Sequence, residues 1–431
     1  MIAVTLGIFA VAFVLIALEW YDKSLVAIMG ALLMVIFGIL TPEEAVAAID
    51  VETIFLLLAM MILVNIASKS GVFEWLNVRI ASFTRGNPLA IFLFFSLMTA
   101  ILSAFLDNVT TVILIVPLTI ELVRGMGKDP KPYIFAEIIF SNIGGALTLI
   151  GDPPNIIIGG ATGFNFLQFV QNLWIPIMIS SVFALIVFGL LFKRKLKPIG
   201  DSLADLLIAN IIIKKLKYDF VKQVMHKDFV IKVAAILLLT VLGFFLQQQI
   251  GLPTYVIALT AAIVLGLLTS KRVNIETALE SVEWTTLFFF AGLFVMVAGV
   301  ESTGLLHEVS EMIANSTTNL FHLSLIILWV SGVVSMVLNN IPFITVMIPV
   351  IFGIQGQLHG VDSNILWWAL SLGTCLGGNA TLIGASANVV AADAANKRGV
   401  KITFLEYMKF SLPLTMGILA LCSVYLFFVT N

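Results

Sequence analysis

Asn142 to Asn155 reads N-I-G-G-A-L-T-L-I-G-D-P-P-N, and this glycine-rich stretch is the basis of the fold prediction. A related stretch in the second half of the chain, from Cys375 to Asn388, reads C-L-G-G-N-A-T-L-I-G-A-S-A-N. The identical pairs are Gly144/Gly377, Gly145/Gly378, Thr148/Thr381, Leu149/Leu382, Ile150/Ile383, Gly151/Gly384 and Asn155/Asn388. A polar motif that occurs twice in an apolar chain indicates an internal repeat.

The composition predicts a membrane protein. Of the 431 residues, 60% are hydrophobic and only 11% are charged, and the mean hydropathy is +1.10. A soluble protein of this size carries about twice that charged fraction, roughly 25%. Apolar segments long enough to cross a hydrocarbon core of about 30 Å recur along the whole chain. We therefore expect an all-α polytopic membrane protein, and the net charge of −2 gives no indication of a nucleic-acid partner.

The residues that usually hold metals or form disulfides are scarce. The only cysteines, Cys375 and Cys422, lie far apart in apolar segments. The four histidines are scattered, at His226, His307, His322 and His359. We expect no disulfide framework, no metal site and no cofactor. We interpret the apolar start of the chain, up to Leu18, as a spanning helix rather than a removed signal peptide, because it lacks a basic start and a cleavage site.

The predicted segments form two halves, residues 1–192 and 229–431. They are joined by a basic cytoplasmic linker, residues 193–228, which holds nine Lys or Arg. In the first half we expect apolar segments at 2–18, 24–40, 51–68, 88–106, 112–125, 133–150 and 173–192, with an interfacial segment at 72–84. In the second half we expect them at 229–249, 255–269, 284–300, 323–338, 343–354, 365–395 and 410–428.

The number of crossings in each half is odd, whether or not the paired limbs after residue 88 and after residue 323 form re-entrant hairpins. The second half is therefore predicted to be inserted upside down relative to the first. In the whole chain we expect about ten transmembrane helices and two re-entrant hairpins. Each half should also contain one discontinuous helix, and this arrangement is typical of secondary transporters. With both termini outside the cytoplasm, all 23 Lys and Arg fall in or beside cytoplasmic segments, as the positive-inside rule requires.

Four polar breaks interrupt the apolar segments: Asp107–Thr111, Gly151–Asn155, Asn339–Pro342 and Gly384–Asn388. Non-helical backbone inside a membrane survives only where it is buried in protein or lines a cavity. Four breaks in matching pairs favour a substrate site over simple helix kinks. The residues expected to form the breaks are Gly144, Gly145, Gly151, Pro153, Pro154, Pro342, Gly377, Gly378 and Gly384. The candidate substrate ligands are Asn108, Thr110, Thr148, Asn155, Asn340, Asn379, Thr381 and Asn388.

Three acidic residues are candidates for proton or ion coupling, because an ionisable group inside a membrane is costly and usually functional. Asp107 and Asp152 correspond to Asn339 and Ala385 in the second half. We expect Asp107 to take the coupling ion, whereas Asp152 either does so or caps the following helix. Glu137 is the third candidate, with an ion pair to Lys131 as the alternative.

The charges around the breaks limit the substrate. We expect no Lys or Arg near them, so neutral polyols, oxyacids or small cations fit better than multiply charged anions. Cys375 adds a soft atom, although a buried cysteine is more often a small hydrophobe.

The strings D-N-V-T-T and A-E-I-I-F-S-N-I-G-G-A-L-T-L-I-G-D-P-P-N resemble the arsenite permease (ArsB) and P-protein branch of the ion transporter superfamily. The resemblance covers essentially the whole chain and extends to the NhaD sodium–proton antiporters. It implies two inverted repeats, transport by alternating access in a bacterial inner membrane, and a substrate held between hairpin tips and helix breaks. It also implies that the protein is no enzyme.

We predict proton-coupled efflux of arsenite or antimonite, with a Na⁺/H⁺ antiporter as the alternative. A passive channel on the same scaffold is a further alternative. An intramembrane aspartyl protease built on Asp107 and Asp152 is less consistent with the sequence, because the inverted repeat has no purpose in it. A cytoplasmic ATPase subunit on the linker and a second copy of the chain stay open as protein partners.

Overall fold

The computed structural model describes residues 2–18, 20–84, 87–193, 195, 227–317, 319–338, 340–358 and 363–430. Every regular element in these ranges is a helix. Most of the predicted linker, residues 194 and 196–226, lies outside the described residues, and so does Asn339.

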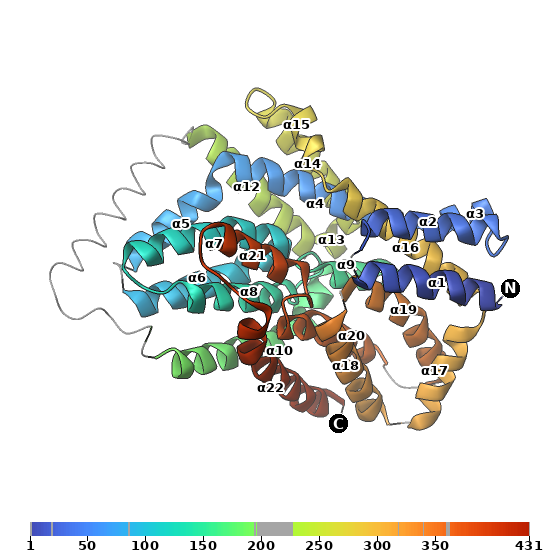
Figure 1. Cartoon of the computed structure of the whole chain (residues 1–431). Helices are drawn as coiled ribbons and strands as arrows, with labels where there is room; N and C mark the ends of the chain where they lie inside the picture. The colour runs from blue at the N-terminus through green and yellow to red at the C-terminus, as the bar shows by residue number, and fades with distance from the viewer. Residues whose placement is uncertain are drawn as a thin grey trace.

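The helices of the first half follow one another in a simple order. They are α1 (Ile2–Leu18), α2 (Lys23–Ile36), α3 (Pro42–Ala47), α4 (Val51–Ser70), α5 (Val72–Phe83), α6 (Pro88–Phe105), α7 (Asn108–Gly125), α8 (Lys131–Gly145), α9 (Pro153–Thr162) and α10 (Phe166–Leu191). Figure 1 places α8 and α9 in the middle of the molecule.

The second half repeats this order with one short extra helix, α13 (Gln247–Ile250), and a 3₁₀ turn at Gly378–Ala380. Its other helices are α12 (Lys227–Phe245), α14 (Thr254–Thr269), α15 (Ile275–Glu280), α16 (Trp284–Glu301), α17 (Leu305–Ser316), α18 (Leu320–Val337), α19 (Asn340–Gln357), α20 (Ile365–Gly377), α21 (Ser386–Lys397) and α22 (Phe404–Thr430). The repeat equivalents α5 and α17 lie at opposite ends of the molecule (Figure 1).

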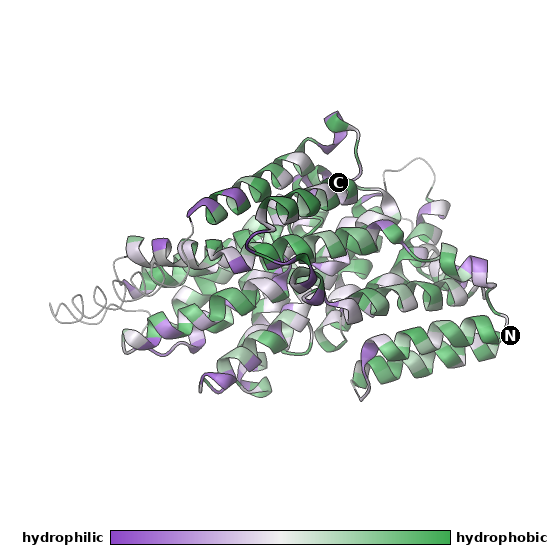
Figure 2. Ribbon diagram, turned by 90° about the horizontal axis from the view of Figure 1, so that it is seen from above, coloured by the Kyte–Doolittle hydropathy of each residue, from purple (hydrophilic) through white to green (hydrophobic). Residues whose placement is uncertain are grey.

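Nine helices within the described residues are long and apolar enough to cross a membrane. They include α6, α7, α18 and α19, so both limbs of each predicted hairpin meet that criterion. Three shorter apolar stretches lie in α1, α2 and α14. The chain is thus an all-helical polytopic membrane protein, as the composition predicts. Figure 2 shows the hydrophobic helical bodies, with hydrophilic residues gathered mainly at helix ends and connections.

Several predicted boundaries were wrong, and the starts of the two second limbs are the ones that bear on the site. The second limbs were expected to begin at residues 112 and 343, but α7 begins at Asn108 and α19 at Asn340. The side chain of Asp107 accepts hydrogen bonds from the Val109 and Thr110 amides, which satisfies the free N–H groups of the first turn of α7. The polar residues therefore belong to a helix start and not to a joining loop.

Helices of each half pack on helices of the other half. In the outer part of the fold, α2 packs on α16 and α14 packs on α4. Nearer the centre, α7 packs on α21 and α19 packs on α9. Each contact joins one half to the other, so neither half encloses a separate core.

The motif glycines allow backbones to touch. A Cβ atom added at Gly144 would lie 2.5 Å from Ala100 Cα of α6, and one added at Gly377 would lie 2.7 Å from Gly332 Cα of α18. Added Cβ atoms at Gly145 and Gly378 would each lie 2.9 Å from the carbonyl oxygen of the break loop of the same half. The glycines at corresponding positions are therefore required in both copies by the same close approach.

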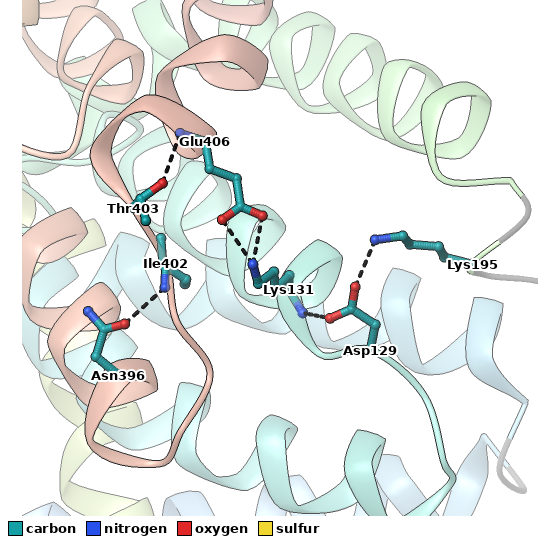
Figure 3. A network of polar contacts seen from close by, with 7 residues as sticks. All are labelled: Asp129, Lys131, Lys195, Asn396, Ile402, Thr403 and Glu406. Atoms are coloured by element: carbon teal, nitrogen blue, oxygen red, sulfur yellow. Dashed lines mark hydrogen bonds and ion pairs between the residues drawn. The ribbon is translucent and has the colours of Figure 1, made fainter.

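Two ion pairs lie at the helix ends near α8 and α22, and one of them, Lys131–Glu406, joins the two halves. Lys131 Nζ lies 2.7 Å from Glu406 Oε1, and Lys195 Nζ lies 2.7 Å from Asp129 Oδ2 (Figure 3). Partial burial opposes ionisation of Asp129, but Lys195 and the Lys131 amide hold the pKa of this carboxyl below its usual value. Because Lys131 pairs with Glu406, the alternative pairing of Glu137 with Lys131 was wrong.

We expect Gly144→Ala to destabilise the protein by about 2–3 kcal/mol, because the new methyl group overlaps the α6 backbone. Thermal unfolding in detergent measures this as a lower Tm and a smaller monodisperse fraction. Gly189→Ala in α10 is the matched control, since a Cβ at Gly189 meets nothing within 4 Å. Equal Tm values for the two variants would contradict the close approach.

Candidate functional site

The tip between α6 and α7 is held by one carboxylate. Asp107 Oδ1 accepts hydrogen bonds from the Val109 amide at 2.8 Å and the Thr110 amide at 3.0 Å. The Thr110 hydroxyl donates to Asp107 Oδ2. Both oxygens of Asp107 are thus engaged within the first turn of α7, so this residue is the helix cap.

The break between α8 and α9 positions the second carboxylate differently. Pro153 and Pro154 start α9, where a missing N–H costs nothing. Asp152 stands at the cap position but makes no capping hydrogen bond, so its predicted role as a cap was wrong. Instead, Asn108 Nδ2 of the tip donates to Asp152 Oδ1 at 3.2 Å. Asp152 is 1% exposed, and its Oδ2 has no hydrogen-bond partner among the described residues.

A chain of buried asparagines crosses the centre from one half to the other. Asn108 Nδ2 also donates to Asn142 Oδ1 at 3.1 Å. Asn142 Nδ2 then donates to Asn379 Oδ1 at 2.9 Å and to Asn388 Oδ1 at 2.8 Å. Asn142 is fully buried, and it was not among the candidate ligands although it begins the quoted motif.

The two break loops are held by equivalent asparagines. Asn155 Nδ2 donates to the carbonyl oxygens of Ala146 and Thr148, at 3.1 and 2.9 Å. Asn388 Nδ2 donates to those of Gly378 and Thr381, both at 2.8 Å. These side chains satisfy backbone oxygens that the interrupted helices leave without partners.

Equivalent threonines tie the break loops to the first limbs of the hairpins. Thr148 Oγ1 donates to the Ala104 carbonyl of α6, and Thr381 Oγ1 donates to the Met336 carbonyl of α18 at 2.6 Å. Their hydroxyl hydrogens are therefore used inside the scaffold.

A cavity of about 380 Å³ lies between the two hairpin tips, and we call it the tip cavity. Of the predicted site residues it brings together Asp107, Asn108, Thr110, Asp152, Pro153 and Asn340. The predicted ligands Thr148, Asn155, Asn379, Thr381 and Asn388 are buried behind it and do not line it. The Cys375 thiol and the Asn340 amide lie beside Asp152.

The tip cavity also has lining residues that the sequence analysis missed. Lys23 of α2 and Glu283 before α16 both line it, so the expectation of no lysine near the breaks was wrong. Asn65 of α4 adds a polar group, and so does Thr286 of α16.

Two of these missed residues have a signal in the sequence. In the register that pairs Gly144 with Gly377, Thr286 matches Thr53, and Glu283 matches the acidic residue Asp50. An acid followed by a threonine thus stands at the same place in both halves. Lys23 has no comparable signal.

A second cavity, of about 320 Å³, lies among the α3–α4 connection, α9, α16 and α19, and we call it the Asp50 cavity. It is lined by Asp50 and Glu301 but by none of the predicted site residues.

Glu137 lies apart from both cavities. It is 1% exposed on α8, and Oε1 accepts a hydrogen bond from the Thr119 hydroxyl of α7. Its Oε2 has no hydrogen-bond partner among the described residues. Among the described residues, the hydrogen bond of Glu137 therefore connects α8 to α7.

A family model described as "Citrate transporter" (CitMHS) matches residues 13–373. The chain belongs to the CitMHS family. This family lies within the ion transporter superfamily, so the chain is a secondary transporter, and the prediction that it is not an enzyme is confirmed.

Several relatives share the length or the fold of this CitMHS protein. A "46 kDa membrane protein" of Mycobacterium leprae is 35% identical over 433 residues, covering 99% of this chain and 98% of the relative. The human P protein is 31% identical, but this chain covers only 58% of its length. The YdaH transporter of Alcanivorax borkumensis shares the fold, with a TM-score of 0.56, 18% identity, and 86% of this chain and 84% of that chain covered.

We expect Asn142→Leu to destabilise this transporter by about 2 kcal/mol or more, because the acceptor oxygens of Asn379 and Asn388 lose their donor in the buried centre. Thermal unfolding in detergent measures the loss. Asn172→Leu on α10 is the control, since the Asn172 side chain bonds only to the Gln168 carbonyl one turn away. A Tm equal to that of the parent would show that the asparagine chain contributes nothing.

Proposed function

We propose that this CitMHS protein is a proton-coupled exporter of trivalent arsenite or antimonite. The observation that carries the proposal is the free oxygen of Asp152, which faces neutral amides and the Cys375 thiol at the meeting point of the two halves. A carboxylate there can take up a proton, and the amides and hydroxyls beside it can bind the hydroxyl groups of an uncharged acid.

The charges of the tip cavity support a neutral or cationic substrate. Among the described residues, Asp107, Asp152 and Glu283 line it together with a single cation, Lys23. A free multivalent anion such as citrate would face three carboxylates in a site of low dielectric, where repulsion between like charges is strong. As(OH)₃ is uncharged at physiological pH and avoids that repulsion.

We propose that Asp152, rather than Asp107, carries the coupling proton. The oxygens of Asp107 already accept three hydrogen bonds from the first turn of α7. A proton on Asp107 would disrupt this cap, whereas a proton on Asp152 Oδ2 displaces no donor. Asp107 then holds the tip in place and keeps a cavity-facing charge.

The topology that we propose has two inverted halves, re-entrant α6–α7 and α18–α19 hairpins, and both termini outside the cytoplasm. The opposite positions of α5 and α17 support the inversion (Figure 1). The tip cavity would open to the cytoplasm, because Ser281 and Glu283 at its edge belong to a connection that also carries Lys271 and Arg272. The Asp50 cavity would face the opposite side, in a bacterial inner membrane.

A Na⁺/H⁺ antiporter is the second candidate, and one observation favours it. Carboxylate, amide and hydroxyl oxygens of Asp107, Asn108, Thr110 and Asp152 all border the tip cavity, and oxygen is the ligand type that hard cations prefer. In this reading Na⁺ and H⁺ compete for Asp152. For protein partners, our predictions are an ATPase subunit bound to the linker and a second copy of the chain in a homodimer.

We expect Asp152→Asn to abolish proton movement coupled to substrate while substrate binding is retained. Asp107→Asn should instead lower the Tm and weaken binding. The amide NH2 cannot accept the hydrogen bond that Asp107 Oδ2 accepts from the Thr110 hydroxyl, and an uncharged cap interacts less favourably with the helix N-terminus. Purified protein in liposomes with an internal pH dye, challenged with arsenite, antimonite, Na⁺ or citrate, measures coupling for each variant. Asp228→Asn, an exposed change at the start of α12, is the control.

The same assay decides between the substrates. A pH response to arsenite or antimonite supports the export proposal, and a response to Na⁺ alone selects the antiporter. A response to citrate alone would overturn both. Proton coupling that survives Asp152→Asn at the level of the control would contradict the assignment of that residue.

A further inference from the structure

The repeat relates the two cavities residue by residue. Lining residues of the tip cavity have their repeat equivalents in the lining of the Asp50 cavity. The pairs are Met61/Phe294, Val64/Val297, Asn65/Ala298, Ser68/Glu301, Ile113/Thr345, Glu283/Asp50 and Val390/Ile157. Over these seven pairs of lining residues the two cavities are copies of one another, formed by the same surfaces of opposite halves.

The copies differ at the start of α4 and its equivalent, the start of α16. At α4, Asp50 Oδ2 accepts a hydrogen bond from Thr53 Oγ1 at 2.5 Å, and Thr53 Oγ1 lies 3.4 Å from the Ile156 carbonyl of α9. A Cβ atom added at Gly160 of α9 would lie 2.5 Å from Thr53 Oγ1 and 3.0 Å from Asp50 Cγ. The Asp50–Thr53 pair therefore lies directly against α9.

The equivalent pair at α16 is open. Thr286 Oγ1 donates to Glu283 Oε2 at 3.0 Å, as Thr53 does to Asp50. Both residues line the tip cavity, and so do Ser386 and Val390 on α21, the helix equivalent to α9. In this half the cavity separates the two surfaces that touch in the other half.

The contact at α9 lies between the two cavities. On α4, Asp50 lines the Asp50 cavity and Leu57 lines the tip cavity. On α9, Ile157 lines the former and Ile156 lines the latter. The contact between Thr53 and Ile156 is therefore part of the wall that divides them.

We propose that the Asp50–Thr53 pair docked on α9 is a closed gate, and that the Glu283–Thr286 pair is its open counterpart. When the tip cavity closes, Thr286 Oγ1 approaches the Val389 carbonyl of α21 as Thr53 now approaches that of Ile156, and Thr53 leaves α9. The inference rests on the proposed alternating access, but it needs no particular substrate.

The two gates are unequal at one position. Gly160 leaves room for the carboxylate of Asp50, whereas its equivalent on α21 is Asp393, which pairs with Lys397 at 2.7 Å. A second carboxylate approaching Asp393 meets a like charge. We therefore expect Thr286, rather than Glu283, to make the closing contact on α21.

Two repeat-equivalent cysteines report the state of the gates. Met61→Cys lines the tip cavity and Phe294→Cys lines the Asp50 cavity. Each cysteine is labelled with a bulky maleimide in detergent-solubilised full-length protein. The parent protein, whose Cys375 and Cys422 are buried, gives the background labelling. Gly160→Ala places a methyl group against Asp50 and Thr53 and so opposes the docked gate. Gly189→Ala is the matched control.

In the Gly160→Ala background we expect Met61→Cys to label several-fold more slowly and Phe294→Cys several-fold faster, with no change in the Gly189→Ala background. A folded, monodisperse Gly160→Ala protein with both rates unchanged would overturn the proposal. Labelling needs no transported ion, so its outcome can be interpreted even if the arsenite proposal is wrong.

A disulfide tests the same proposal without the glycine change. Thr286→Cys and Val390→Cys face the tip cavity from α16 and α21. We expect them to oxidise slowly in the resting protein and, once joined, to suppress labelling of Met61→Cys and increase labelling of Phe294→Cys. A joined protein whose Phe294→Cys still labels at the resting rate would show that the two gates are not reciprocal.

Discussion

The constraint on which the structure depends is that an interrupted helix in a membrane must satisfy its own backbone. Two asparagines at equivalent positions do this, Asn155 for the first break and Asn388 for the second, each donating to two carbonyl oxygens of its own loop. Once the loops are held, the polar side chains between them can face a cavity instead of the backbone. The breaks are thus rigid frames, and the cavity lies beside them.

The proposed coupling residue lies where the two break loops differ. The second half has Ala385 where the first has Asp152, so this carboxylate has no acidic equivalent in the second half. Asn142 differs from its equivalent Cys375 in the same way, and it joins the halves through Asn379 and Asn388. The shared residues build the scaffold, whereas the unshared ones supply a charge and an inter-half bond.

Much of this could be predicted from the sequence because the repeat is visible at a fixed spacing. The glycines, the helix breaks and the two asparagines all follow from matching Asn142–Asn155 with Cys375–Asn388. The individual roles of Asp107 and Asp152 were not separated, although the sequence holds a signal for them. Pro153 and Pro154 have no N–H group to donate to Asp152, whereas the Val109 and Thr110 amides donate to Asp107. Lys23 was missed because only tertiary packing of α2 on α16 brings it to the tip cavity.

The exchange of packing partners between the halves has a consequence for biosynthesis. Helix α4 leaves the ribosome long before α14, on which it packs, and α7 long before α21. During that interval the first half lacks the partners of the Asn142 amide, Asn379 and Asn388, which belong to the second half. The early helices therefore reach their final packing only after the second half is inserted, and the last helices synthesised complete the central site.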